Sequence, residues 1–74
     1  MAHEIRAEMV ANVMTVDVAV GDQVGNGDSV VMLESMKMEI PVLTERPGRV
    51  HRIAVGPGDV VREGDLLAVI ENPN

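Results

Sequence analysis

The chain contains one pattern twice, and this internal repeat constrains the fold more than any other feature of the sequence. The pairs Gly21-Asp22 and Gly27-Asp28 return 37 residues later as Gly58-Asp59 and Gly64-Asp65. The same offset relates further positions: Val13 with Val50, Val16 with Ile53, Val18 with Val55, Val24 with Val61, Leu33 with Ile70 and Glu34 with Glu71. A unit this short cannot bury its own apolar face, so we expect the two copies to share one core.

Each copy has the pattern of short β-strands separated by turns. Apolar residues alternate with other residues, as in Val16–Val20, which is the period of a half-buried strand. The Gly-Asp pairs predict turns, because glycine accepts a positive φ and aspartate bonds to nearby backbone groups. The apolar pattern changes parity between Val13 and Val16 and again between Val50 and Ile53, which predicts a β-bulge at the same place in both copies.

The composition favours an all-β core. The chain has 74 residues, of which 46% are hydrophobic, with no cysteine and no aromatic residue, so it forms one domain at most. Valine dominates the apolar set and favours extended backbone. We expect about eight short strands in two facing sheets, a flattened antiparallel β-barrel/sandwich with quasi-twofold symmetry. This domain would span residues 9–71, after a flexible N-terminus or first-strand lead-in at 1–8 and before a tail at 72–74.

The charge and the hydropathy pattern exclude several classes of partner. A net charge of −6 opposes the binding of phosphates, which makes nucleic acid an unfavourable partner. No apolar run approaches the roughly 20 residues of a membrane span, and the first residues lack the apolar core of a signal peptide. We therefore expect a cytoplasmic protein that uses no membrane. Prolines and charges along the sheet edges predict a monomer.

Lys37 is the only lysine of the chain. The strands expected at 30–34 and 39–43 leave Met36-Lys37 as a two-residue hairpin turn. Such a turn needs positive φ, yet neither residue is glycine or asparagine, and a departure from turn chemistry more often indicates function than structure. The repeat offset carries Lys37 onto Asn74, so the hairpin and the chain ends are expected at opposite ends of the domain.

The hairpin and its surroundings resemble a biotinyl (biotin carboxyl carrier) domain over about Met9 to Glu71. The resemblance rests on Glu34-Ser35-Met36-Lys37-Met38-Glu39, on Gly27-Asp28 upstream, and on Pro41, Gly48 and Gly58-Asp59 downstream. It implies that Lys37 carries covalent biotin, attached by a biotin protein ligase that reads Met36 and Met38. It also implies that the biotin carries a carboxyl group between a biotin carboxylase and a carboxyltransferase, and that the domain itself is not an enzyme.

Three further residues complete the expected recognition site for the ligase. Ser35 stands where the family usually has alanine, and we expect biotinylation to survive this exchange of one small residue for another. Glu34 and Glu39 face each other across the hairpin and could be read by a basic surface of the ligase. Few residues precede the first expected strand, which is typical of a small stand-alone biotinylated protein, and a carrier excised from a larger carboxylase fits as well.

Two alternatives remain open for the hairpin. A lipoyl domain shares the fold and the central lysine, but that family usually has an acidic residue where this chain has Met36. The chain could also be an unmodified interaction module whose methionines dock a partner. Catalysis by Glu34 and Glu39 would need a cleft that a hairpin tip lacks. The Gly-Asp turns lack the ligand spacing of a calcium loop, and two histidines without cysteine do not predict a metal site.

Overall fold

The computed structural model describes residues 2–72, and its regular elements are all strands. Eight strands follow in chain order: β1 (Ala2–Arg6), β2 (Ala11–Val16), β3 (Gln23–Val24), β4 (Ser29–Ser35), β5 (Met38–Leu43), β6 (Gly48–Ile53), β7 (Val60–Val61) and β8 (Leu66–Glu71). They form two antiparallel sheets, with strand orders β1-β8-β6-β3 and β5-β4-β2-β7. The predicted class, two antiparallel sheets of about eight strands, is confirmed.

The two halves of the chain are related as the repeat predicts. The bounds of β2 and β3 fall on those of β6 and β7 after a shift of 37 residues. The two sheet orders interconvert when each strand is replaced by its counterpart four strands away. Matched apolar residues are buried together, with Val13 and Val50 at 2% and 1% exposure and Leu33 and Ile70 at 2% and 1%. Both halves therefore contribute matched residues to one core.

Both predicted bulges are present. The register of β2 against β4 shifts between Val13 and Thr15, and that of β6 against β8 shifts between Val50 and Arg52. The extra residue lets each strand turn a second apolar side chain toward the core after the parity change. The bulges bend β2 and β6 at equivalent places and so preserve the symmetry of the two sheets.

The four Gly-Asp pairs form equivalent turns. Their glycines have φ between 91° and 96°, a region open to glycine at no steric cost. In each turn the aspartate Oδ2 accepts the N–H of the residue three positions earlier at 2.8–2.9 Å; the donors are Ala19, Gly25, Gly56 and Arg62. These carboxylates are used within their own turns, which explains why aspartate follows glycine in every copy.

The expected domain start at residue 9 is too late. Ala2–Arg6 form β1, which pairs with β8 and buries Ile5 to 6% exposure, so this segment is itself a strand of the first sheet rather than a flexible terminus or a lead-in before the domain. Only one side chain of the strand enters the core, and its apolar pattern is too short to predict a strand. The backbone pairing with β8 holds it instead. Of the expected tail, residues 73 and 74 lie outside the described part of the chain.

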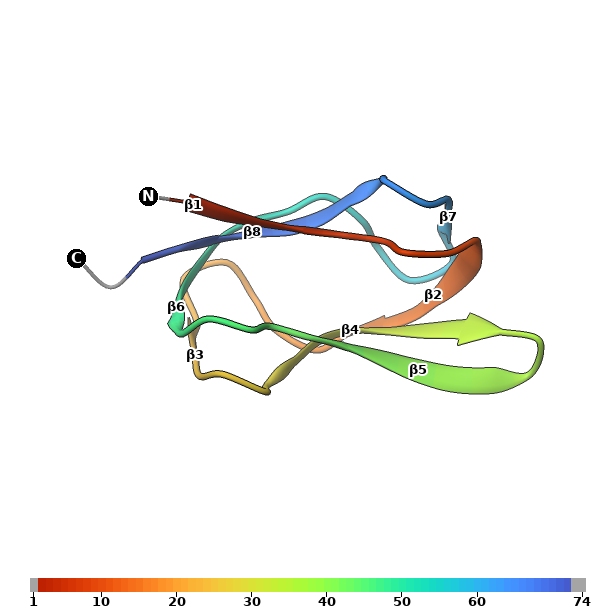
Figure 1. Cartoon of the computed structure of the whole chain (residues 1–74), viewed down its shortest axis with the longest axis horizontal. Coiled ribbons are helices and arrows are strands. Elements are labelled where there is room, and N and C mark those ends of the chain that lie inside the picture. Colours follow the sequence, from red (N-terminus) through yellow and green to blue (C-terminus); the bar gives the residue numbers. More distant parts are fainter. Residues whose placement is uncertain (1, 73–74) are drawn as a thin grey trace.

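The molecule is elongated, with principal extents of 38 × 18 × 17 Å. Figure 1 shows the β4–β5 hairpin at one end of the long axis, while β1 begins and β8 ends at the other. This is the arrangement that the repeat offset predicts for the lysine hairpin and the chain ends. No stretch of residues 2–72 forms a helix long and apolar enough to cross a membrane.

Candidate functional site

The β4–β5 hairpin ends in a tight turn formed by Met36 and Lys37. The two strands pair outward as far as Ser35 opposite Met38, which leaves two residues in the turn. Met36 has φ 52° and Lys37 has φ 65°, and they are the only non-glycine residues with positive φ among residues 2–72. Two positive φ values define a type I′ turn, which normally takes asparagine and glycine. The predicted two-residue turn is therefore confirmed, and it holds methionine and lysine in a backbone conformation that is unfavourable for both.

The tip of the hairpin is strongly exposed. Met36 is 91% exposed and Met38 is 61% exposed, so the turn buries neither methionine. Lys37 is exposed as well and takes part in no hydrogen bond or ion pair with any other residue of the described chain. An amine without partners at the end of a projecting hairpin is accessible to an enzyme that modifies it.

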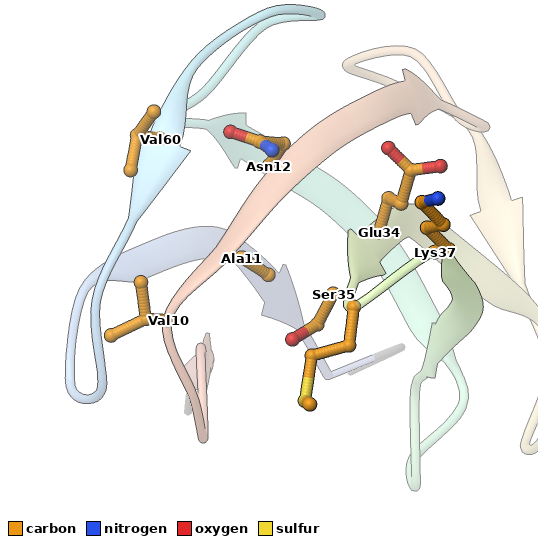
Figure 2. Close-up of a pocket in the computed structure, with 8 residues that line it drawn as sticks. Val10, Ala11, Asn12, Glu34, Ser35, Lys37 and Val60 are labelled. Atoms are coloured by element: carbon orange, nitrogen blue, oxygen red, sulfur yellow. The ribbon is translucent and has the colours of Figure 1, made fainter.

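The two glutamates of the predicted recognition site lie on the two strands that lead into and out of the turn. Glu34 and Glu39 are direct cross-strand partners, as expected, and this like-charge pair slightly destabilises the hairpin. On the other side of β4, Glu34 lies opposite Asn12 of β2, and Asn12 lies opposite Val60 of β7. Figure 2 shows the side chain of Lys37 lying toward Glu34. The surface around the amine is therefore acidic.

The two histidines lie in the other sheet. His3 is in β1 and His51 is in β6, where the Nδ1 of His51 lies 2.8 Å from Oε1 of Glu71. Glu71 is the repeat counterpart of Glu34. One glutamate of this matched pair thus has an imidazole partner, whereas Glu34 at the lysine end has no such partner among residues 2–72.

A hollow of about 260 Å³ opens beside the hairpin. Its walls come from three strands, the turn and the residue before β2: Val10, Ala11, Asn12, Glu34, Ser35, Met36, Lys37 and Val60. Figure 2 shows Val10 and Val60 on one side of it and Glu34 and Lys37 on the other, with Asn12 and Ser35 between them. Sequence reasoning missed the wall formed by Val10, Asn12 and Val60. The repeat offered one sign of this wall. Asn12 is uncharged where its counterpart Arg49 is charged, and Val60 is apolar where its counterpart Gln23 is polar.

Comparison with known proteins places this geometry in a family. The model of a family of biotin and lipoyl domains, described as biotin-requiring enzyme, matches residues 3–70. The chain therefore belongs to the biotin/lipoyl family of domains. It is 57% identical over 70 residues to a protein of Mycobacterium leprae named biotinylated protein TB7.3 homolog, a match that covers 95% of this chain and 99% of that protein.

Solved structures agree with the family assignment. The chain superposes on part of the urea carboxylase of Kluyveromyces lactis with a TM-score of 0.90 and 38% identity, covering 96% of this chain and 6% of the carboxylase. It also superposes on the lipoyl domain of the 2-oxoglutarate dehydrogenase complex from Azotobacter vinelandii, with a TM-score of 0.81 and 26% identity, covering 96% and 98% of the two chains. Both likenesses support the flattened barrel-sandwich fold.

Proposed function

We propose that the domain is a biotin carboxyl carrier in which the Nζ of Lys37 holds the cofactor in an amide bond. One observation carries the proposal: the only lysine of the chain stands exposed in a strained turn at the far end of a biotin/lipoyl fold. Its flanking methionines and the similarity to a protein named as biotinylated support biotin over lipoate.

The residues at the tip fit a covalently attached group. Among residues 2–72 the amine of Lys37 has no hydrogen-bond or ion-pair partner, and the β4–β5 hairpin that carries it lies at one end of the long axis (Figure 1). The two histidines of the chain lie in the other sheet, so a ligase must activate the reaction. In the ligase, a carboxylate oxygen of biotin bonds to the α-phosphorus of ATP, and pyrophosphate leaves, which gives an acyl adenylate. The Lys37 nitrogen then bonds to the acyl carbon, AMP leaves with the bonding electron pair, and the amine proton passes to the ligase or to solvent.

When bound, biotin supplies a ring nitrogen that accepts and releases a carboxyl group. The contribution of this chain is mechanical. Lys37 tethers the ring, and the rigid two-sheet body keeps the tip exposed to large partners. A tether raises the effective concentration of the ring at each partner site and replaces free diffusion between them. We propose a biotin carboxylase and a carboxyltransferase as these partners. The monomeric state and the cytoplasmic location predicted from the sequence stay predictions.

We further propose that the ligase reads Met36 and Met38 through apolar contact, and Glu34, Glu39 and Ser35 through polar contact. Exposed methionines adapt their shape to a partner surface. Carboxylates beside the amine would attract a basic surface and raise the rate of encounter.

The double substitution Met36→Glu with Met38→Ala tests whether the methionines are read. The rate of biotinylation should fall about tenfold or more, which corresponds to a loss of about 1.4 kcal/mol in binding free energy. Leu43→Ala is the control, since Leu43 is a 48% exposed apolar residue of the same strand far from the tip. A double variant that is modified as fast as the wild type would show that the methionines are not recognised.

The proposed function is tested by intact mass after incubation with a biotin protein ligase, ATP and biotin. The wild type should gain the mass of one biotinyl group, and Lys37→Arg, which keeps the positive charge, should gain none. A parallel incubation with a lipoate ligase and lipoate tests the rival cofactor. A wild type that gains only a lipoyl group, or gains nothing, would contradict the proposal.

A further inference from the structure

The outer face of the sheet β5-β4-β2-β7 carries a row of side chains that leads away from Lys37. Cross-strand pairing places Glu39, Glu34, Asn12 and Val60 side by side in that order. Val60 closes the row and is 65% exposed. Its repeat counterpart Gln23 is polar and lies at the same place on β3. At this position of the fold, the lysine end has an apolar side chain and the other end has a polar one.

The hollow beside the hairpin combines apolar walls with polar groups that have no partners. Val10 is 64% exposed and stands with Val60 on one wall (Figure 2). The side chains of Asn12, Ser35 and Glu34 make no hydrogen bond to any other residue within the described range 2–72. Exposed valines and free hydrogen-bonding groups around one hollow are features of a site for a small amphipathic ligand.

The proposed modification would tether such a ligand at the edge of this hollow. Lys37 is itself one of the lining residues. Val60 belongs to the second strand away from β4, at a lateral distance of about 10 Å, because neighbouring strands are about 4.8 Å apart. Lys37 also stands three residues beyond Glu34, up to about 10 Å further along the strand direction, which makes the whole separation about 14 Å at most. The lysine stem, the acyl chain and the ring of biotin together exceed that distance when extended, so the ring can reach the wall without any movement of the backbone.

We infer that the hollow is a resting site for the bicyclic ring of the biotin carried by Lys37, an inference that rests on the proposed function. The sulfur-containing ring would pack on Val10 and Val60. The ureido ring has two N–H donors and one carbonyl acceptor, which match the carboxylate of Glu34 and the side-chain amide of Asn12. A shallow open hollow gives weak binding, and the tether compensates with a high local concentration. The ring is thus held between visits to partner enzymes and is released without a conformational change.

Methyl and amide NMR of the bare and the biotinylated protein tests this inference, with intact mass recorded on the same samples. Biotinylation should shift the methyl signals of Val10 and Val60 and the side-chain amide of Asn12, with cross-relaxation between ring protons and the Val60 methyls. Val60→Gln copies the residue found in the other half. It should reduce the Asn12 shift about threefold, because the ring loses its apolar contact. Val20→Gln is the control, since Val20 is 63% exposed but lies outside the hollow.

The outcomes separate the resting site from the proposed function. A biotinylated protein whose shifts are confined to residues 35–39 would overturn the resting site and leave the carrier function standing. A protein that never gains the biotinyl mass would overturn both. Equal shifts in Val60→Gln and Val20→Gln would show that the valine wall does not hold the ring. The comparison of the bare and the biotinylated wild type tests the resting site even if neither variant folds.

Discussion

Gly48 shows how a single residue breaks the symmetry of the repeat. It begins β6 beside β8, and a Cβ built there would lie 2.7 Å from Cγ2 of Ile70 and would collide with the carbonyl group of Glu71. Its counterpart in the first half is Ala11, which is buried to 5% exposure and retains its methyl group. A methyl group therefore fits at position 11 but not at the equivalent position 48.

We predict that Gly48→Ala lowers the free energy of unfolding by about 1–3 kcal/mol, because the added methyl group forces β6 away from β8. Ala11→Gly is the matched control at the equivalent position. It should cost about 1–2 kcal/mol through the greater backbone freedom of glycine and the loss of one buried methyl group, without displacing a strand. Urea unfolding followed by far-UV circular dichroism measures both variants. A Gly48→Ala variant as stable as the wild type would show that the β6–β8 contact is looser than described.

At the scale of elements, the β4–β5 hairpin contains two destabilising features, and both lie at its tip, where the attachment of biotin is proposed. Two side-chain-bearing residues adopt left-handed backbone in its turn, at a cost of about 1 kcal/mol each. The cross-strand pair of Glu34 and Glu39 adds a repulsion. Features of this kind persist where a site needs particular residues rather than the most stable ones.

We predict that Met36→Asn raises the free energy of unfolding by about 0.5–1 kcal/mol, because asparagine tolerates positive φ better than methionine. The same variant should be biotinylated more slowly if the ligase reads Met36. Met38→Asn is the control within β5, where asparagine is a poor strand residue and should destabilise. Chemical denaturation measures the stability of both. If Met36→Asn were less stable than the wild type, the turn would not be the strained element described here.

The sequence predicted the bulges and the Gly-Asp turns because each has a local signal that appears twice, and it predicted the hairpin from the two apolar stretches that flank Met36 and Lys37. The parity change after Val13 recurs after Val50, and the Gly-Asp pairs have equivalent φ values. The first strand was not predicted, because a single buried residue, Ile5, gives no periodicity. The wall of the hollow was not predicted either, since an exposed valine such as Val60 has no pattern until cross-strand pairing shows its neighbours.

At the scale of the whole molecule, the two halves are interlocked rather than stacked. The first sheet takes β1 and β3 from the first half and β6 and β8 from the second, and the other sheet does the reverse. Four of the six strand pairings join the two halves: β1–β8, β3–β6, β4–β5 and β2–β7. Neither half retains a complete sheet or a closed core without the other.

We predict that fragments 1–37 and 38–74 are each unfolded alone, because each loses those four strand pairings and half of the shared core. An equimolar mixture should recover part of the dispersed amide spectrum of the intact chain. Amide proton NMR of each fragment and of the mixture measures this. A dispersed spectrum for either fragment alone would show that the repeat unit folds independently.

The attachment of biotin to Lys37 is tested most directly by tryptic digestion of the protein after biotinylation. Trypsin cleaves after Lys37 only when its amine is free, and Pro47 protects the bond after Arg46. In the digest of the modified protein, residue 37 should lie in the single peptide Ala7–Arg49, which should be heavier by one biotinyl group. Its fragment ions should locate the added mass at Lys37. The bare protein should yield Ala7–Lys37 and Met38–Arg49. Cleavage after Lys37 in protein that has gained the biotinyl mass would contradict the assignment.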